Sequence, residues 1–241
     1  MIYRIVKRVF DVVCSLVGII VTSPLWLVIL IGIKASSKGP FFYTTERIGK
    51  KGKPFTLYKF RSMHEYKPDG TGKKREGSYI ANDDRIFPLG KILRKSKLDE
   101  LPQVINILAG QMSVVGPRPL PPVSARNNYS GKYACALDMR PGLTCLDSLY
   151  DYAHGELFVK DNATYKQTVV PMKNELAKMY VERADARLDL HCITRTAGLM
   201  WRIAVKKQKT FPLTKYETEA EEQLRQQRGG TPGTVPSVSQ E

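Results

Sequence analysis

The hydrophobic pattern is dominated by one long apolar segment near the start of the chain. Residues 12–33 carry no charged side chain, and at about 22 residues they are long enough to cross a hydrocarbon core as a straight helix. This uniform hydrophobicity favours a helix that meets lipid over a helix buried in a soluble core. A cleaved signal peptide fits poorly, because the apolar run is too long and Lys34 and Lys38 follow it closely.

A break at the middle of this segment changes the prediction. Pro24 lacks a backbone donor and kinks a helix, and the hydroxyl of Ser23 can bond a carbonyl that the proline leaves free. Each half then has about 11 residues, or roughly 16 Å, which is only half of the hydrocarbon core. We therefore expect a re-entrant helix-break-helix that enters and leaves one leaflet, with a kinked spanning helix as the alternative.

Both flanks of the segment are basic, and basic flanks favour the cytoplasmic side of a membrane. The cations are Arg4, Lys7 and Arg8 before the segment and Lys34 and Lys38 after it. The stretch 4–11 predicts the start of an interfacial helix, whose apolar side chains touch lipid while its cations meet lipid phosphates. Asp11 lies at helical spacing from Lys7 and Arg8, so we expect it to pair with one of them.

The pattern after this anchor predicts a hairpin and a short helix. Two strands, residues 41–45 and 55–60, flank a basic turn that contains glycine. The polar, glycine-containing stretch 65–78 reads as a surface loop. Residues 88–96 predict a short helix that turns Ile92 and Leu93 inward.

A second amphipathic helix follows, and Gly110 ends it. Its apolar positions at i, i+3, i+4 and i+7 are Leu101, Val104, Ile105 and Leu108. The prolines of the stretch 117–122 then exclude a helix and predict a rigid, extended connection.

The second half of the chain is predicted to be helical. Residues 175–204 read as two pieces, and the polar stretch 216–228 could form a short exposed helix. The candidate inner faces are Leu176, Met179 and Tyr180, then Leu188, Leu190, Ile193 and Ala197. The fold class is therefore α+β and mainly helical. It has three parts: a membrane-associated segment at 1–38, a small cytoplasmic domain with the hairpin at 39–205, and a polar, partly disordered tail at 206–241.

The charge balance predicts an anionic partner. The formal net charge is +15 at pH 7, which fits nucleic acid, an anionic membrane surface or phosphorylated substrates. We expect no nucleic acid partner, because the cations accompany an apolar segment and are not interleaved with base-stacking aromatic residues. The four cysteines and three histidines lack metal-ligand spacing, so we expect neither a zinc site nor a disulfide framework. The oligomeric state stays open, with a homo-oligomer as one option.

The strongest candidates for chemistry are two adjacent carboxylates, Asp99 and Glu100, which follow Arg94 and two lysines. At a helix N-terminus, beside cations, both would be held in the ionised form. An ionised carboxylate can attack phosphorus and can bind Mg²⁺. The competing interpretation is that Ser96 and Asp99 form a capping box, or that Asp99 is the N-cap, with no further role.

Three further cations extend the candidate site. Arg118 lies in the rigid, proline-rich connection and could bind a phosphate with two hydrogen bonds. Lys59 and Arg61 lie at a strand end and add positive charge. Together with the carboxylates they predict a phosphoryl-transfer site, whereas the alternative treats all the cations as solvated surface.

An ordered set of motifs runs through residues 2–143. The motifs are KRVFD, the apolar segment broken at Ser23-Pro24, KFRSM, NDDRI, LRKSKLDELPQ, GPRP and RPGLT. In this order and spacing they resemble the bacterial sugar transferase family, monotopic phosphoglycosyltransferases that initiate glycan assembly on a polyprenyl phosphate.

The resemblance implies transfer of a sugar phosphate from a UDP-sugar to undecaprenyl phosphate, with release of UMP and a need for Mg²⁺. It implies that Asp99 is the nucleophile and carries a covalent phosphosugar, while Glu100 assists the metal or a proton transfer. Lys59, Arg94 and Arg118 match positions that face phosphates. A re-entrant anchor would keep the catalytic domain on the cytoplasmic face of the bacterial inner membrane, in contact with membrane lipids.

The sequence departs from the family pattern after Leu143. Cys145 stands where the family has glycine, and Ala177 stands where an aspartate precedes a Tyr-Val pair. Three aspartates could substitute, and the sequence does not rank them: Asp147, Asp151 and Asp161. The departure supports a second hypothesis, a non-catalytic or degenerate membrane-associated binding protein of a glycan-assembly system.

Overall fold

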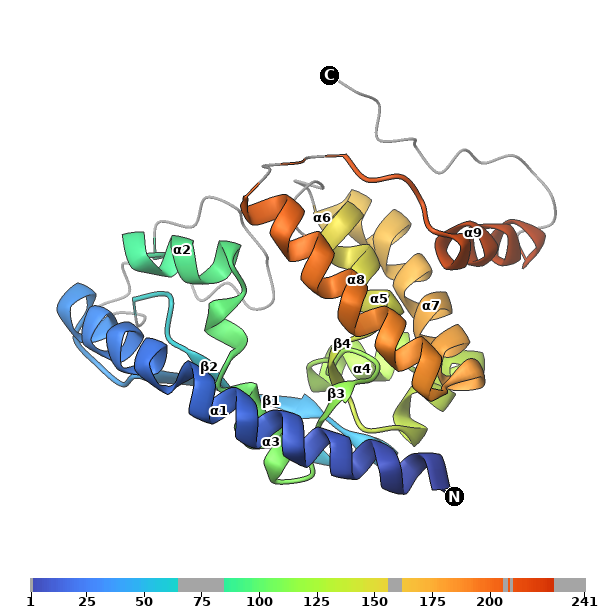
Figure 1. The fold of residues 1–241 in the computed structure, drawn as a ribbon. Coiled ribbons are helices and arrows are strands. Elements are labelled where there is room, and N and C mark those ends of the chain that lie inside the picture. The colour runs from blue at the N-terminus through green and yellow to red at the C-terminus, as the bar shows by residue number, and fades with distance from the viewer. Residues whose placement is uncertain (1, 65–84, 156–161, 206–207, 209, 228–241) are drawn as a thin grey trace.

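The computed structural model describes residues 2–64, 85–155, 162–205, 208 and 210–227. Most of these residues are helical, and their strands form two small pairs (Figure 1). The helices are α1 (Ile2–Ser36), α2 (Pro88–Lys95), α3 (Gln103–Leu108), α4 (Pro122–Asn128), α5 (Leu146–Tyr150), α6 (Asn162–Thr164), α7 (Val170–Arg183), α8 (Ala186–Ala204) and α9 (Lys215–Gln227). The strands are β1 (Phe42–Ile48), β2 (Pro54–Phe60), β3 (Ser113–Val115) and β4 (Gly142–Thr144). The mainly helical prediction is confirmed, while the loop predicted at 65–78 and the tail after residue 227 lie outside the described residues.

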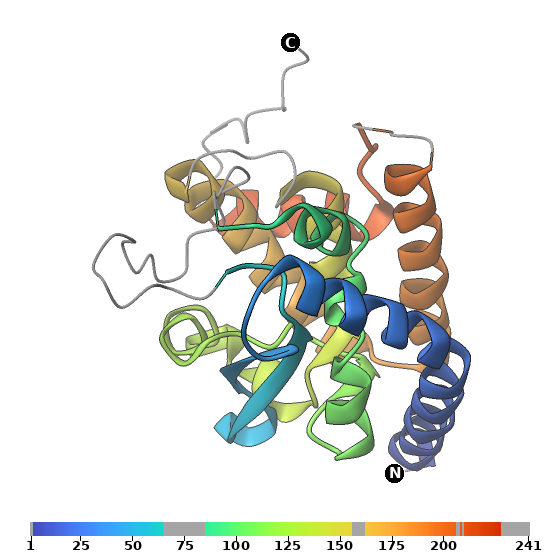
Figure 2. The same cartoon turned by 90° about the vertical axis from the view of Figure 1, so that its left-hand side faces the viewer.

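Helix α1 contains the whole apolar segment, and Figure 2 shows that it bends about half-way along. Pro24 lies inside the helix and cannot donate to the carbonyl of Ile20, four residues back. The hydroxyl of Ser23 donates to that carbonyl at 2.8 Å in its place. The predicted helix-break-helix is therefore one continuous helix that bends, and its freed carbonyl is satisfied.

The apolar side chains of α1 face outward along both halves. Ile20 is 71% exposed and Val28 is 66% exposed. Within the described part of the chain, α1 is the one helix long and apolar enough to cross a membrane, and 11% of its most apolar window is buried. A helix packed into a soluble core would hide such residues, so this exposure favours contact with lipid.

Asp11 does not pair with Lys7 or Arg8, so that prediction is wrong. The side chain is buried at the docked face of α1. Its Oδ1 accepts hydrogen bonds from the Ser113 hydroxyl at 2.9 Å and from the Val114 N–H at 2.8 Å. The carboxylate satisfies a backbone donor of β3 that would otherwise be buried without a partner, which fixes α1 against the body.

Lys7 and Arg8 also bind the protein body, where the sequence predicted lipid phosphates. The Lys7 ammonium forms an ion pair with Asp189 of α8 at 2.6 Å. Arg8 donates to the carbonyls of Ile107 and Leu108, at 2.6 and 2.9 Å, where α3 ends. These bonds satisfy carbonyls that a helix end leaves open.

Strands β1 and β2 form the predicted antiparallel hairpin, with Phe42 opposite Phe60. Its turn contains two residues with positive φ, Lys51 at 57° and Gly52 at 72°, and glycine adopts this conformation without steric cost. Leu57 of β2 is buried in a cluster that includes α3. The hairpin therefore packs directly on the helix that follows the two carboxylates.

Helix α3 is shorter than predicted and faces the core differently. Ile105 is 39% exposed, whereas Asn106 is fully buried. The Asn106 side chain accepts from the Tyr58 N–H at 3.2 Å and donates to the Thr56 carbonyl at 2.7 Å. The polar side chain turns inward because it satisfies backbone groups along β2, and the apolar face predicted as the inner one is partly exposed.

The parallel pair of β3 and β4 was not predicted. It brings the two glycine motifs together, because Gly116 donates its N–H to Thr144 and Gly142 donates to Pro117. A Cβ atom on Gly142 would lie 2.1 Å from the Gly116 nitrogen, so this close approach requires glycine. The pair fixes the start of the proline-rich stretch that carries Arg118.

The C-terminal helices build the main core. As predicted, α7 and α8 are separate helices, and Leu176, Met179 and Tyr180 of α7 are fully buried. Helix α9 matches the predicted polar helix, although Ala220 is buried in this core and the helix is not fully exposed. Three residues predicted to face inward are exposed instead: Ile92, Leu190 and Ala197.

The docking of α1 predicts that Asp11→Ala destabilises the protein. The substitution leaves the partly buried Val114 N–H and the buried Ser113 hydroxyl without their acceptor, which costs about 1–3 kcal/mol. Thermal unfolding of the full chain in detergent measures the effect, with Asp138→Ala, a change at an exposed aspartate, as the matched control. Equal melting temperatures for the two variants would contradict this account of α1.

Candidate active site

Asp99 and Glu100 lie in a short 3₁₀ turn, Leu98–Glu100, between α2 and α3. Lys97 precedes the turn with a positive φ of 58°, which reverses the chain after α2. The capping predictions are wrong, because the Ser96 hydroxyl donates back to Ile92 and Pro102 occupies the N-cap of α3. The pair is therefore placed by the turn and caps no helix.

Glu100 is the charge centre of the site. One carboxylate oxygen, Oε1, accepts from the Lys59 ammonium at 2.8 Å and from the Arg118 guanidinium at 3.0 Å. Glu100 is 8% exposed, and although burial alone would raise its pKa, the charges of Lys59 and Arg118 hold that pKa well below its usual range. The structure thus places side by side three of the residues that the sequence analysis assigned to one site.

Asp99 has a different environment, although it is the next residue. It is also 8% exposed, and its Oδ1 is buried with no hydrogen-bond partner among the described residues. Burial raises the pKa of Asp99 to about 6; the Lys59 charge opposes this shift and the Glu100 charge adds to it. The sequence predicted that nearby cations stabilise the ionised forms of both carboxylates, and this holds for Glu100 only. With a pKa of about 6, Asp99 is still about nine-tenths ionised at pH 7.

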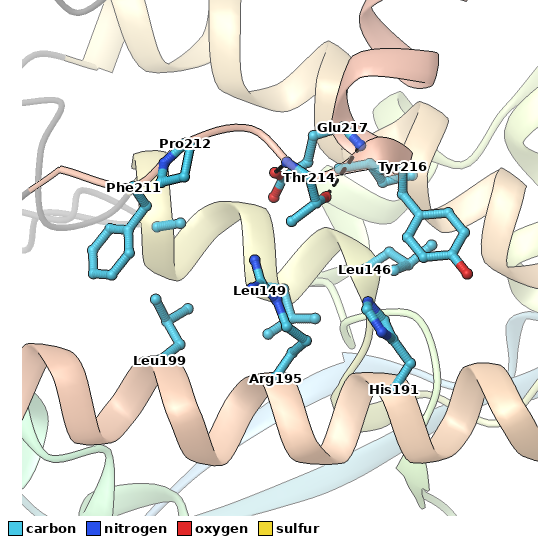
Figure 3. Close-up of a pocket in the computed structure, with 12 residues that line it drawn as sticks. Leu146, Leu149, His191, Arg195, Leu199, Phe211, Pro212, Thr214, Tyr216 and Glu217 are labelled. Atoms are coloured by element: carbon cyan, nitrogen blue, oxygen red, sulfur yellow. Dashed lines mark hydrogen bonds between the residues drawn. The ribbon is translucent and has the colours of Figure 1, made fainter.

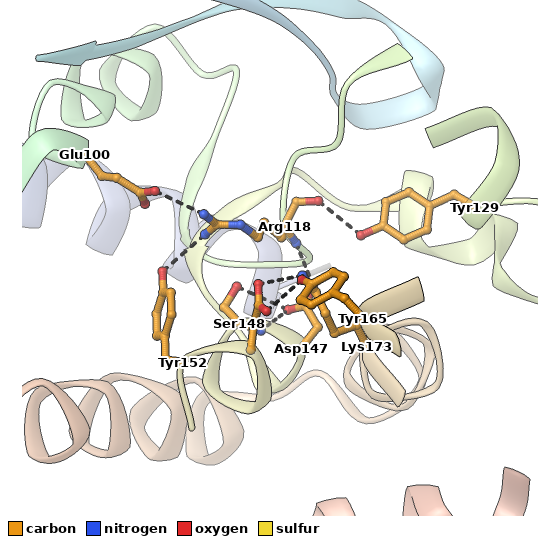
Figure 4. Close-up of polar contacts among 9 residues, drawn as sticks. Glu100, Arg118, Tyr129, Asp147, Ser148, Tyr152, Tyr165 and Lys173 are labelled. Carbon is orange, nitrogen blue, oxygen red and sulfur yellow. Dashed lines mark hydrogen bonds and ion pairs between the residues drawn. The ribbon is translucent and has the colours of Figure 1, made fainter. Parts of the chain in front are cut away.

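Arg118 is held in place by the segment that departs from the family pattern (Figure 4). Its backbone N–H donates to the buried carboxylate of Asp147 at 2.9 Å, and its guanidinium donates to the Tyr152 hydroxyl at 3.2 Å. The Tyr129 hydroxyl donates to the Arg118 carbonyl at 3.1 Å. Asp151 instead forms an ion pair with Lys173 at 2.6 Å. Of the three aspartates that the sequence could not rank, Asp147 thus contacts the site and Asp161 lies outside the described residues.

Tyr152 is a site residue that sequence reasoning missed. It belongs to a π-helical turn, Asp151–Gly155, and its ring lies beneath two cations, with the Lys97 ammonium 4.8 Å and the Arg118 guanidinium 5.8 Å from the ring centre. Such contacts attract a cation to the ring face. Because Tyr152 is 52 positions from Glu100 in a segment without a recognisable motif, no local signal pointed to it.

Two predicted phosphate-binding arginines have different surroundings. The charge of Arg94 lowers the pKa of Asp99, which places this guanidinium near the pair, and it also donates to the Met63 sulfur at 3.3 Å. Arg61 is not brought to the carboxylates. Its guanidinium is buried and donates to the carbonyls of Ser37 and Lys38, at 2.7 and 2.5 Å, just after α1.

Arg47 of β1 is a second residue near the site that sequence reasoning missed. It lies on the same face of the hairpin as Lys59, and its Nε is buried without a hydrogen-bond partner in the described part of the chain. Burial lowers its pKa, the nearby Arg118 charge lowers it further, and the Glu100 charge opposes both. Two guanidinium groups held close together favour binding of an anion between them.

The donor set fits a magnesium ion. The described residues contain no group of three or more His, Cys, Asp or Glu that could hold a metal by themselves. Mg²⁺ is usually held by one or two carboxylates, with waters and substrate phosphates completing the shell. The Oδ1 atom of Asp99, which binds no described residue, supplies such an oxygen, whereas Glu100 already forms two ion pairs through Oε1.

A separate cavity lies between α5, α8 and the segment that leads to α9 (Figure 3). It is lined by apolar residues such as Leu149 and Leu199, with His191, Arg195 and Glu217 at its polar edge. At about 20 Å³ it holds about one water molecule, and no predicted site residue lines it. The cavity is a packing feature of the α9 contact, too small for a sugar nucleotide.

Comparison with known proteins now identifies the family. A family model described as bacterial sugar transferase matches residues 2–203. The chain belongs to the bacterial sugar transferase family. The resemblance in the motifs of residues 2–143 is thereby confirmed, and the match extends through the divergent segment to α8.

Named relatives of this family member come from several bacteria. The exopolysaccharide production protein ExoY of Rhizobium meliloti is 40% identical over 58% of this chain and 66% of its own length. A putative undecaprenyl-phosphate N-acetylgalactosaminyl 1-phosphate transferase of Bacillus subtilis is 43% identical over 50% of this chain and 65% of its own length. A UDP-glucose:undecaprenyl-phosphate glucose-1-phosphate transferase of Caulobacter vibrioides is 40% identical over 79% of this chain and 67% of its own length. The chain thus spans about two thirds of the length of these relatives.

Because the negative charge of Glu100 raises the pKa of Asp99, we predict that Glu100→Gln lowers that pKa below about 6. The substitution removes a neighbouring negative charge and releases Lys59 and Arg118 to act on Asp99. NMR titration of protein with carbon-13-labelled aspartate measures the shift. Glu46→Gln, at an exposed glutamate, is the control that leaves the Asp99 pKa unchanged. An unchanged or higher Asp99 pKa in Glu100→Gln would refute this layout.

Proposed function

We propose that this chain is a membrane-associated phosphoglycosyltransferase that moves a sugar 1-phosphate from a UDP-sugar to undecaprenyl phosphate and releases UMP, which initiates a membrane glycan. The observation that carries the proposal is the environment of Asp99. Its Oδ1 is buried, has no hydrogen-bond partner among the described residues, and lies in the field of cations such as Lys59, which Glu100 also binds. The names of family relatives, which specify undecaprenyl-phosphate sugar-phosphate transfer, support the same reaction.

The chemistry follows in two displacements at one phosphorus atom. The Asp99 carboxylate attacks the sugar-linked phosphorus of the UDP-sugar, and the bond to the bridging oxygen breaks as UMP leaves. This gives an aspartyl phosphosugar. A phosphate oxygen of undecaprenyl phosphate then attacks the same phosphorus, forms a diphosphate-linked sugar and releases the Asp99 carboxylate.

The pKa values of the two carboxylates suit these roles. Asp99, with a pKa of about 6, is mostly ionised at pH 7 and keeps more basicity than an ordinary aspartate, which favours attack. Glu100 stays ionised and holds Lys59 and Arg118 where the phosphate oxygens develop charge. Bound Mg²⁺ would be held by Asp99 and Glu100, with substrate phosphate oxygens, and would neutralise phosphate charge.

The anchor accounts for a lipid acceptor. A bend at Ser23-Pro24 and exposed apolar side chains on both halves of α1 support a re-entrant helix in one leaflet. The basic flanks favour the cytoplasmic side, so we place the catalytic domain on the cytoplasmic face of the bacterial inner membrane. The acceptor phosphate then reaches Asp99 from the membrane surface.

The non-catalytic hypothesis rested on the divergence after Leu143. The contacts of Asp147 and Tyr152 with Arg118 tie that segment to the candidate site, which supports a working enzyme. Release of UMP from any member of a UDP-sugar panel, in the presence of undecaprenyl phosphate and Mg²⁺, separates the two hypotheses. No release with any sugar would favour the binding protein.

Asp99→Asn is expected to lower UMP release at least about a thousandfold, because the amide keeps the shape of the side chain and loses the nucleophile. The measurement uses the full chain in nanodiscs with the best UDP-sugar from the panel. Asp138→Asn, at an exposed aspartate, is the matched control that keeps turnover. Full turnover by Asp99→Asn would exclude the nucleophile assignment.

A further inference from the structure

A basic cleft opens beside the first turns of α1, at the end of α3 away from the carboxylate pair. Its walls are formed by Arg4, Ile5, Arg8, Val9 and Arg140. Its volume is about 620 Å³, within the range of about 300–1,000 Å³ that is typical of sites for small ligands. The cleft is therefore large enough for a ligand and separate from the candidate active site.

Three arginines give the cleft its charge. Arg8 and Arg140 are fixed by the carbonyls at the end of α3, where Arg140 Nε donates to Gly110 at 2.8 Å. Carbonyl acceptors orient these guanidinium groups without neutralising them. Arg4 is exposed, and no hydrogen bond or ion pair joins it to a described residue. Among the described residues, no carboxylate lines the cleft and offsets this positive charge.

Lys50, in the hairpin turn, adds a fourth cation at the edge. Burial lowers the pKa of its ammonium, and the charges of Arg140 and Arg4 lower it further, which places all three groups close together. Asp138 is the one acidic group that acts in the opposite direction on Lys50. Such a cluster of like charges is stabilised when an anion binds.

The apolar wall identifies the kind of anion. Ile5 and Val9 are each 58% exposed and lie one helical turn apart. They continue into the outward apolar face of α1, where Val13 and Leu16 are 52% and 48% exposed. A free phosphate would make no favourable contact with this apolar wall. A phospholipid would place its anionic headgroup on the arginines and its acyl chain along Ile5 and Val9.

The geometry points to a binding site for an anionic phospholipid of the surrounding bilayer, with its phosphodiester on Arg4, Arg8 and Arg140 and an acyl chain along Ile5 and Val9. This site is distinct from that of the lipid acceptor. Asp99 lies in the turn before α3, whereas Arg8 and Arg140 bind carbonyls at the other end of that helix, so the cleft and the nucleophile lie at opposite ends of α3. A phosphate in the cleft is therefore out of reach of the nucleophile.

The experiment reads lipid contact directly and does not depend on turnover. The full chain is placed in phosphatidylcholine nanodiscs that contain a small fraction of photoactivatable phosphatidylglycerol, and crosslinked peptides are mapped by mass spectrometry. We expect crosslinks on the peptides that contain residues 4–9 and Arg140. Arg4→Gln lowers their yield about fivefold, as expected for one cation near an anionic lipid, and Arg4→Lys restores it. Lys166→Gln changes an exposed cation in the turn directly after α6, a helix that lies away from α1 (Figure 1), and leaves the yield unchanged.

Competition distinguishes the sources of the phosphate. Unlabelled phosphatidylglycerol displaces the probe if the site binds phospholipid, while inorganic phosphate and undecaprenyl phosphate at the same concentration do not. Equal yields in Arg4→Gln and Lys166→Gln would overturn the proposal. Displacement by undecaprenyl phosphate alone would also overturn it and assign the cleft to the acceptor. Because UMP release is measured separately, failure of this site leaves the proposed transferase reaction intact.

Discussion

The candidate site depends on one shared acceptor, the Oε1 atom of Glu100, which binds the Lys59 ammonium and the Arg118 guanidinium. These two cations come from a β-hairpin and from a proline-rich connection, so a single carboxylate joins three distant segments. A buried pair of this kind is costly to break, because removal of one partner leaves an uncompensated charge. The neighbouring carboxylate, Asp99, has an oxygen without a hydrogen-bond partner in the described part of the chain, and burial, together with the Glu100 charge, raises its pKa.

The membrane anchor is joined to this site through the other end of α3. Arg8 satisfies the last carbonyls of α3, and Asp11 satisfies the backbone of β3, which leads to Arg118. Charged groups that would be expected at a lipid surface are thus used to dock α1 on the body. These contacts fix the position of α1 relative to the short helix that follows the carboxylate pair.

Much of this architecture could be predicted from the sequence, because it rests on local signals. The apolar segment, its break at Ser23-Pro24, the hairpin and the helices at 175–204 each follow from composition or periodicity over short stretches. The grouping of Lys59, Glu100 and Arg118 was predicted from their charges and from the resemblance, since no local rule brings residues 41 and 18 positions apart together.

What was missed depends on contacts between distant segments. Asp11 pairs with β3 and not with its helical neighbours because docking buries it, and the inward turn of Asn106 depends on the edge of β2. Tyr152 and Asp147 could not be assigned because their partner, Arg118, comes from a connection that no periodicity describes. The segment after Leu143, which departs from the family pattern, thus holds Arg118 in place beside Glu100.

The most direct test of the central claim is to look for the covalent intermediate. The protein is incubated with Mg²⁺ and an accepted UDP-sugar in the absence of undecaprenyl phosphate, and its peptides are examined by mass spectrometry. The account predicts that the peptide containing Asp99 gains the mass of one sugar phosphate, and that addition of undecaprenyl phosphate removes it. Turnover with no adduct on that peptide, or with an adduct elsewhere that the acceptor discharges, would contradict the account.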